Sequence, residues 1–324
     1  MIILGGICVV RMIIKRMIQA IPMLIAISIV SFLLIKLAPG DPVQAYITPE
    51  MGPAEIESIR ESMGLNSPIH IQYIRWLKSA LKGDLGYSLV NHRPVAIQII
   101  ERLPATLGLM GASLFISMIL GIIIGLISAS NQNKVFDNIA TFTSYLGISI
   151  PSFWFAMMLV YVLSLKLKLL PSIGMRTIGV HTTWDLIKHG IMPTIVLSLQ
   201  NIATVTRYIR SSTISQLRED YVIVEYASGA SKREVLYKYV LKNAILPVIT
   251  ILGMSLPGLV SGAFITESIF GWPGMGQLGI KSIFSYDYPL IMAITMFSSF
   301  ILIIGNLLSD VLYGIADPRI KELK

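Results

Sequence analysis

Long runs of apolar residues, separated by short polar stretches, make up most of this chain. A helix that crosses a membrane needs about 20 consecutive, mostly apolar residues, and six segments reach or approach that length. They lie at about 17–37, 107–128, 139–165, 191–205, 248–270 and 290–313. The pattern therefore predicts an all-α integral membrane protein with six transmembrane helices.

Three of the predicted spans contain a proline: Pro151 in the third, Pro193 in the fourth and Pro257 in the fifth. Proline removes a backbone donor and clashes with the preceding turn, and membrane helices accommodate it at kinks. We therefore expect bends near these three positions.

The polar stretches divide the chain into four parts. Residues 1–37 hold an N-terminal segment and the first span, and residues 38–104 form a long outer loop. Residues 105–316 form a five-helix core with a charge-rich loop at 207–246, and residues 317–324 form a short tail. Within the outer loop we expect two helices and a glycine-flanked turn. They lie at 53–63, 73–81 and 84–88.

Composition agrees with a membrane protein, because 54% of the residues are hydrophobic and only 14% are charged, against about 25% charged in soluble domains. The formal net charge is +8. Basic cytoplasmic loops account for this excess better than nucleic-acid binding does. Placing those loops inside puts both termini in the cytoplasm and the 38–104 loop outside. The single cysteine, Cys8, excludes a disulfide within the chain.

The first residues differ from the start of an ordinary span. Met1–Val10 is apolar and uncharged, and it lacks the basic region of a signal peptide. Met12 is a more usual beginning, because Lys15 and Arg16 follow it and the first span comes next. We therefore expect that the protein starts at Met12 and that Met1–Arg11 is an upstream extension.

The charge-rich loop at 207–246 reads as two short helices joined at Gly229. A stripe with helical spacing precedes the glycine. It consists of Ile214, Leu217, Tyr221 and Val224. Gly229 suits a helix C-terminus because glycine adopts a left-handed conformation without a Cβ clash. Ser231 and Glu234 have the spacing of a capping box, and Pro247 ends the second helix.

We interpret the two halves of this loop differently. The second helix, to about Asn243, places Val235, Leu236, Tyr239 and Val240 on one face. Such a helix is expected to lie on the membrane surface with this face down. The corner at Glu225–Gly229 carries small residues and forms a smooth knuckle that suits a partner's groove.

The corner also resembles a known family. Glu225-Tyr226-Ala227-Ser228-Gly229, followed after a spacer by Ile245-Leu246-Pro247, resembles the cytoplasmic EAA-type loop of ABC-importer permeases. Further fragments of the oligopeptide, dipeptide and nickel branch recur in order. They are Ala38-Pro39-Gly40-Asp41-Pro42, Gly64-Leu65-Asn66-Ser67-Pro68, Gly83-Asp84-Leu85-Gly86, Glu101-Arg102-Leu103-Pro104, Phe270-Gly271-Trp272-Pro273-Gly274, Asp287-Tyr288-Pro289 and Asp317-Pro318-Arg319. The branch commonly has Ala-Arg/Lys-Ala-Lys-Gly at the corner, so the charge offered to a partner differs here.

The resemblance implies the first permease subunit of a type I ABC importer, with a MetI-like transmembrane domain in a bacterial or archaeal inner membrane. It implies four kinds of partner: the lipid bilayer, a second permease, two ATPase subunits and an extracytoplasmic substrate-binding protein. The ATPases would bind ATP and Mg²⁺, and this chain would hold no cofactor. It also implies the ATPase-coupling residues, which are Glu225, Tyr226, Ala227, Ser228, Gly229, Leu246 and Pro247.

Three other functions stay open. One is import of nickel or a metal chelate rather than of peptides. Another is an autonomous channel or secondary transporter, although no charged relay or internal repeat lies within the spans. The last is a membrane enzyme, for which the sequence offers no catalytic constellation. Gly274–Gly279 matches a dinucleotide fingerprint in letters only, because it lies between two spans rather than in a βαβ unit.

Polar residues inside or beside the spans are the remaining candidates. Gln200, Asn201 and Ser255 are expected to line a translocation path, with hydrogen bonding between helices as the alternative. Glu267 and Trp272 are expected at an outer gate or a binding-protein contact, with a structural pair to a nearby base as the alternative for Glu267. The four histidines fall in outer loops without the spacing of metal ligands, and they read as exposed loop residues. They are His70, His92, His181 and His189.

Overall fold

The computed structural model describes residues 2–37, 43, 47, 50–62, 64–255, 258–261 and 263–316. In this part of the chain the regular elements are helices, and one isolated β-bridge joins Tyr87 and Pro94. The predicted all-α class is therefore confirmed.

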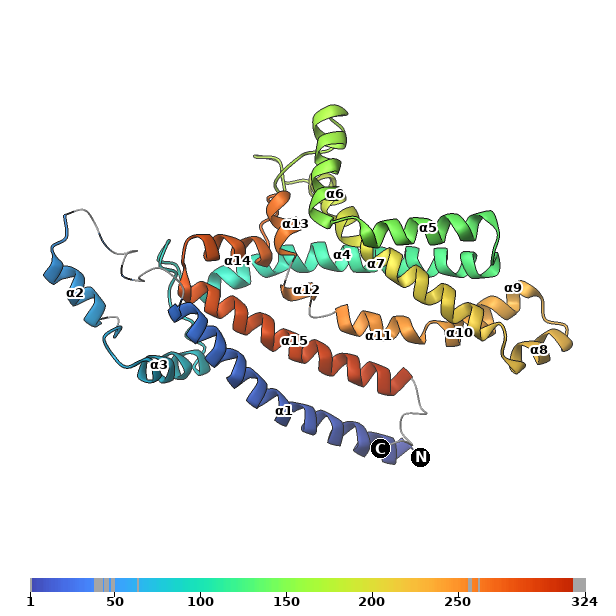
Figure 1. Cartoon of the computed structure of the whole chain (residues 1–324), viewed down its shortest axis with the longest axis horizontal. Helices are drawn as coiled ribbons and strands as arrows, with labels where there is room; N and C mark the ends of the chain where they lie inside the picture. Colours follow the sequence, from blue (N-terminus) through green and yellow to red (C-terminus); the bar gives the residue numbers. More distant parts are fainter. Residues whose placement is uncertain are drawn as a thin grey trace.

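Four long helices form an elongated body (Figure 1). They are α1 (Ile2–Leu37), α4 (Val95–Ser130), α7 (Thr183–Gln216) and α15 (Tyr288–Ala316). Shorter helices connect and flank them. They are α2 (Pro53–Ser62), α3 (Ile69–Leu81), α5 (Val135–Ser149), α6 (Ser152–Leu159), α8 (Asp220–Ala227), α9 (Lys232–Glu234), α10 (Leu241–Ala244), α11 (Leu246–Ser255), α12 (Gly258–Ser261), α13 (Phe264–Ile269) and α14 (Met275–Phe284), with π-helical turns at η2 (Val160–Lys166) and η3 (Val235–Val240).

Within the described residues, four helices are long and apolar enough to cross a membrane, or up to five if the bent pair α5–α6 counts as one span. The predicted fourth span lies in α7, which is not one of these helices, because polar residues such as His189, Gln200 and Asn201 keep its mean hydropathy low. The stretch Lys232–Gly253, which runs from α9 into α11, qualifies alongside α1, α4 and α15. The count of six transmembrane helices therefore stays a prediction.

The predicted bend near Pro151 is present and large. Helices α5 and α6 meet at an angle of 101°, so α5 runs beside α4 while α6 turns away from the long axis (Figure 1). Ile150 has an extended backbone, with ψ 123°, because a following proline disfavours the helical conformation. Pro193 lies inside α7, which continues through it, and Pro257 lies outside the described residues.

The predicted fifth span, 248–270, is not one helix. It is divided among α11, which ends at Ser255, the short α12, and α13, which begins at Phe264. Glycine and serine are frequent in this stretch, and glycine weakens a helix by about 1 kcal/mol relative to alanine.

Close packing of α4 against α7 forms the centre of the molecule. A Cβ at Gly121 would lie 2.6 Å from Val205 Cβ, and a Cβ at Gly125 would lie 2.8 Å from Ile209 Cβ. Glycine at both positions lets the two helices approach, as small residues do in membrane proteins. Ser117 and Ser198 add buried hydrogen bonds across the same interface, because each hydroxyl donates to a backbone carbonyl of the other helix.

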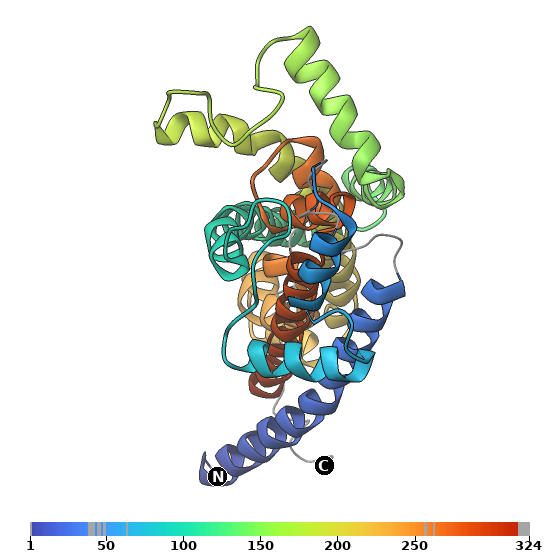
Figure 2. The ribbon, with the colours of Figure 1, turned by 90° about the vertical axis from the view of Figure 1, so that its left-hand side faces the viewer.

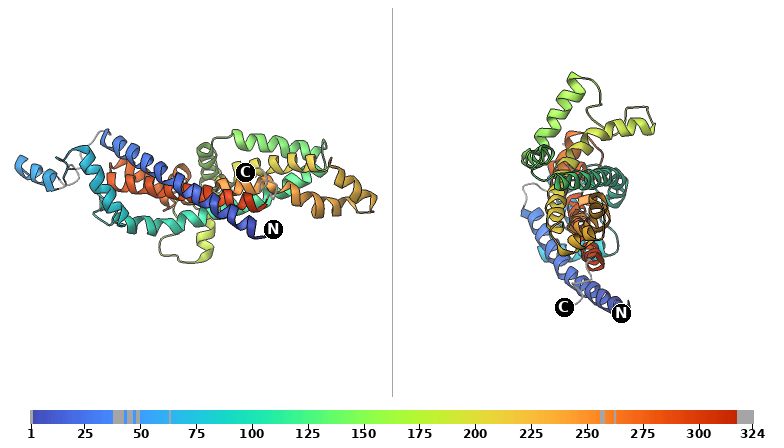
Figure 3. Two further views of the ribbon diagram at one scale, coloured as in Figure 1. Left: turned by 90° about the horizontal axis from the view of Figure 1, so that it is seen from below. Right: turned by 90° about the vertical axis from the view of Figure 1, so that its right-hand side faces the viewer.

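Different elements occupy the two ends of the body (Figure 3). Helices α2, α3 and α14 lie at one end, and α8, α9 and η3 lie at the other. Helix α3 crosses the ends of α1 and α15 (Figure 2). The two helices predicted in the outer loop are both present, although α3 begins at Ile69 rather than Tyr73. The expected glycine turn follows, with positive φ at Gly83 and Gly86.

Candidate functional site

The corner between α8 and α9 turns at Gly229, whose φ is 89°. The amide of Gly229 donates to Tyr226 O at 3.0 Å, and the amide of Ala230 donates to Glu225 O at 3.1 Å. This pair of hydrogen bonds is the Schellman motif that ends many helices at a glycine. Ser231 then caps α9 by accepting from the Glu234 amide at 3.2 Å. Local sequence signals therefore determine the shape of this corner.

The corner is open to solvent. Tyr226, Ala227, Ser228 and Gly229 are exposed, and Glu225 is half-buried. A Cβ added at Gly229 would meet no atom within 4 Å. The corner is thus a smooth surface of small, exposed residues that a partner can reach.

A buried apolar cluster lies directly behind the corner. It joins Val222 of α8 and Val235 and Val240 of η3 to Val205 and Ile209 of α7. The expectation that the second helix rests on the membrane surface, apolar face down, is therefore wrong. Its apolar face packs against the helical core, which removes those side chains from solvent and lipid alike.

The stripe predicted before the corner is only partly present. Helix α7 ends at Gln216 and a separate helix begins at Asp220, so one continuous helical face does not form. Leu217 and Tyr221 pack against the cluster, whereas Val224 is 61% exposed.

Leu246 and Pro247 lie apart from the corner, at the first positions of α11. Both are half-buried. The next residue, Val248, is buried in the cluster behind the corner. Of the residues predicted to act in coupling, only Glu225–Gly229 therefore form the exposed corner.

A buried ion pair near the same end was not predicted. Arg210 of α7 donates to Asp137 Oδ1 from Nε at 2.5 Å and to Oδ2 from Nη2 at 2.7 Å. The Ser128 hydroxyl and the Asn133 amide also donate to this carboxylate. The sequence did carry a signal that Asp137 is paired: it is an acidic residue at the start of an otherwise apolar segment. Acidic residues in such segments are normally paired.

The three residues predicted to line a path do not hydrogen-bond with one another in the described structure. Asn201 donates to Leu197 O at 3.3 Å and Ser255 donates to Ile251 O at 2.8 Å, each within its own helix. Gln200 is exposed. Their part in a path stays a prediction.

Glu267 and Trp272 are both buried, at 0% and 4% exposure. Glu267 accepts from Thr106 Oγ1 at 2.9 Å and from the Gln277 amide at 3.0 Å, so the carboxylate lies at the N-terminus of α14. Trp272 Nε1 donates to Ala105 O at 2.9 Å. The two residues tie the α13–α14 loop to α4, and a partner would reach them only if this loop opened.

His189 is not an exposed loop residue, contrary to expectation. It is 6% exposed, and its Nδ1 lies 2.9 Å from Gly174 O. Its Nε2 lies 3.7 Å from Asp185 Oδ1. The Thr177 amide and hydroxyl donate to the same carboxylate and lower the pKa of Asp185. Among the described residues, no group of three His, Cys, Asp or Glu side chains is placed to hold a metal ion.

Several long apolar helices around a tightly packed core are the features of a multi-pass membrane protein. Residues 121–322 match the family described as binding-protein-dependent transport system inner membrane component, and residues 9–110 match its N-terminal counterpart. The chain belongs to this family, whose members are membrane permease components of ABC transporters and not enzymes. It is therefore a multi-pass inner-membrane protein.

Relatives of known name match over nearly the full length. The oligopeptide transport system permease protein AppB of Bacillus subtilis is 42% identical over 95% of this chain and 98% of its own. The dipeptide permease DppB of Alkalihalophilus pseudofirmus is 36% identical, and the glutathione permease GsiC of Escherichia coli K12 is 35% identical, each over the same shares.

A solved structure supports the fold. The inward-facing MetNI methionine ABC transporter aligns with a TM-score of 0.54 at 13% identity, covering 68% of this chain and 97% of that chain. The MetI-like architecture implied by the resemblance is therefore confirmed.

Proposed function

We propose that this chain forms half of the translocation pathway of a type I importer for dipeptides or oligopeptides. Its partners would be a second permease of the same family, two ATPase subunits that bind ATP and Mg²⁺, and an extracytoplasmic binding protein. The chain itself would hold no cofactor. The names of the peptide and glutathione permeases above, at 35–42% identity, support the substrate class.

The exposed corner at Glu225–Gly229 would be the point where an ATPase docks. One observation supports this most: the cluster behind the corner contacts both α7 and α4, through residues such as Ile209 and Met118. Interiors packed this closely transmit displacement rather than absorb it. A push on α8 would therefore move the two central helices together, which is the kind of rigid shift that switches a pore between states.

The corner would face the cytoplasm, with both chain termini on the same side. The distribution of basic residues between the loops supports this orientation. The start of α1 and the end of α15 also lie toward the end of the molecule that carries α8 (Figure 1).

Gln200, Asn201 and Ser255 would line the path between the two permeases. Glu267 and Trp272 would act at the outer mouth by holding the α13–α14 loop closed against α4. Cysteine substitution of Gln200 or Asn201, followed by a water-soluble thiol reagent on the assembled transporter, tests the path. Labelling in neither the resting nor the ATP-bound state would reject it.

Coupling is tested by Gly229→Asp in the assembled transporter. Asparagine and aspartate have nearly the same shape and both tolerate positive φ, so Gly229→Asn is the matched control. We expect both variants to insert in the membrane. The aspartate variant should lose ATPase co-purification and peptide uptake, whereas the asparagine variant should retain most of both. Normal uptake by Gly229→Asp would reject the docking assignment.

Substrate class is tested by competition in the same system. Uptake of a labelled dipeptide should fall in the presence of unlabelled dipeptides and oligopeptides and should be unaffected by chelated nickel. Inhibition by the nickel chelate alone would overturn the peptide assignment while leaving the coupling assignment intact.

A further inference from the structure

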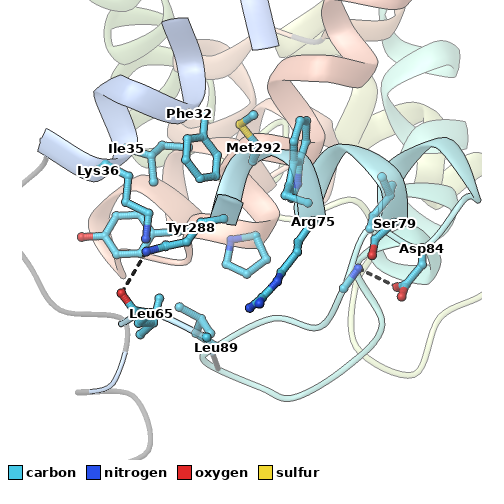
Figure 4. A pocket seen from close by; sticks show the side chains of 16 residues that line it. Phe32, Ile35, Lys36, Leu65, Arg75, Ser79, Asp84, Leu89, Tyr288 and Met292 are labelled. Atoms are coloured by element: carbon cyan, nitrogen blue, oxygen red, sulfur yellow. Dashed lines mark hydrogen bonds between the residues drawn. The ribbon is translucent and has the colours of Figure 1, made fainter. Parts of the chain in front are cut away.

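A pocket of about 420 Å³ lies at the end of the molecule opposite the corner. Helices α1, α3 and α15 and the turn at 84–89 form its walls (Figure 4). Lys36 and Arg75 reach into it from α1 and α3, and Phe32, Ile35 and Met292 form one wall. The proposed transport function uses none of these residues.

Aromatic side chains fix α3 to the end of the first span. Tyr73 Oη forms a 2.7 Å hydrogen bond with Ser28 Oγ, and its ring lies 5.5 Å from that of Phe32 and 6.1 Å from that of Trp76. Tyrosine and tryptophan concentrate where a membrane meets water. Their presence at the end of an apolar span indicates that the pocket lies at the depth of the lipid headgroups.

Helix α3 itself has the character of an interfacial helix. Ile69, Ile74 and Leu81 are exposed, and the helix also carries the basic residues Arg75 and Lys78. A helix with exposed apolar residues and basic residues is suited to lie in the plane of the interface. A helix in that plane would border the pocket with lipid.

Arg75 has the position and the chemistry of an anion-binding residue. Among the described residues, no carboxylate lies within ion-pair distance of it, and Nη1 donates to Ser67 Oγ at 3.3 Å. A Cβ at Gly64 would stand 2.7 Å from Nη1, so glycine makes room for the guanidinium. Asp84 also lines the pocket, and its Oδ1 accepts from the Gly86 amide at 2.9 Å.

We propose that this pocket binds the headgroup of a phospholipid. The phosphate would lie at Arg75, beside Lys36, and the acyl chains would follow the wall made by Phe32, Ile35 and Met292. Guanidinium groups bind phosphate through paired, charge-assisted hydrogen bonds. The pocket volume is within the range of about 300–1,000 Å³ common for small-molecule sites. A bound lipid would hold α3 against α1 and α15, whatever solute the permease carries.

The test uses the purified, delipidated transporter complex and a short-chain phosphatidylglycerol, with binding followed by native mass spectrometry. Arg75→Gln and Lys78→Gln each remove one positive charge from α3, but only Arg75 lines the pocket. We expect one lipid per chain and about tenfold weaker binding for Arg75→Gln, the effect of losing about 1.4 kcal/mol. Lys78→Gln should bind as the unaltered chain does.

Two further probes identify the ligand. Inorganic phosphate and an uncharged diacylglycerol should each bind far more weakly than phosphatidylglycerol. Displacement of the lipid by equimolar phosphate would show a site for a free anion, and equal binding of diacylglycerol would show that the phosphate is not recognised. Either of these results would overturn the proposal. It would also be overturned if both variants lost lipid affinity equally, or if the unaltered complex bound no lipid. Arg75 is exposed, so its replacement leaves no cavity, and unchanged co-purification of partner subunits serves as the folding control.

Discussion

Asp137 accepts hydrogen bonds from α4, from α7 and from the turn that precedes α5. Its side chain is 1% exposed, against 27% for its partner Arg210. A buried charge is tolerated only with such partners, because desolvation is otherwise prohibitive. The pair therefore fixes how three helices meet at the end of the molecule that carries the corner.

Removing this carboxylate should lower stability more than removing an exposed one. Loss of one partner from a buried pair commonly destabilises by about 3–5 kcal/mol, and we expect at least about 2 kcal/mol for Asp137→Asn, since Arg210 can partly reach water. The control is Glu101→Gln, which breaks the ion pair with Arg93. The side chain of Glu101 is 49% exposed and that of Arg93 is 50% exposed. Exposed pairs contribute at most about 1 kcal/mol. Thermal unfolding of the purified protein should rank the two variants in this order, and equal midpoints would contradict the assignment.

Gly125 of α4 also contacts residues far away in the sequence, namely Thr206 and Ile209 of α7. A Cβ there would lie 2.8 Å from both Ile209 Cβ and Thr206 O, so Gly125→Ala should force α4 and α7 apart and destabilise by about 1–3 kcal/mol. Gly111→Ala in the same helix is the control, because a Cβ at Gly111 would meet nothing within 4 Å. A lower unfolding midpoint is expected for Gly125→Ala only. Matching midpoints would show that the interface relaxes freely.

How far the sequence predicts single residues depends on where their partners are. Gly229 and Ser231 were assigned correctly because a helix end is defined by residues within a few positions. The partners of Asp137 and Glu267 were not predicted, because Arg210 and Thr106 lie far away along the chain. A single sequence carries no signal for such pairs.

At the scale of elements, η3 shows why an apolar stripe is ambiguous. Val235 and Val240 face one side of a basic helix, which fits a helix resting on lipid as well as one resting on protein. The structure places both at 0% exposure in a cluster with α7. Periodicity thus predicted the buried face correctly but not the surface that covers it.

This packing predicts unequal effects of two valine substitutions. Val235→Ala should destabilise by about 1–2 kcal/mol, the loss of two buried methyl groups plus the cavity they leave. Val224→Ala, at a residue that is 61% exposed, should change stability by less than about 0.5 kcal/mol. Chemical denaturation of the detergent-solubilised protein measures both. Similar effects would favour the membrane-surface arrangement instead.

Span boundaries were predicted less well than the existence of helices. Pro151 signalled a bend but not its size of 101°, because the direction of α6 depends on what it packs against. Ala156 of α6 belongs to one buried cluster with Met192 and Val196 of α7 and with Phe270, the residue that follows α13. A hydropathy pattern does not encode this long-range contact.

At the scale of the whole molecule, the corner and helix α3, which borders the pocket, lie at opposite ends of the long axis (Figure 3). Residues at the two ends should therefore face opposite sides of the membrane. In a Cys8→Ser background, Ser228→Cys should react with a membrane-impermeant thiol reagent only after the cells are opened. Lys82→Cys should react in intact cells. The reverse pattern would invert the proposed orientation, and labelling of both in intact cells would refute a membrane-spanning body between them.

Two buried carboxylates, Glu267 and Asp287, flank α14. Both accept hydrogen bonds from residues that come much earlier in the chain. Asp287 takes hydrogen bonds from the Ser88 hydroxyl and the Leu89 amide, and Glu267 takes one from Thr106. All three donors belong to the segment 9–110, whereas both acceptors belong to 121–322. The two segments that match the family are therefore not interchangeable between relatives. A chimaera that takes one segment from a relative should fold only if that segment supplies donors or acceptors that fit those of the other segment.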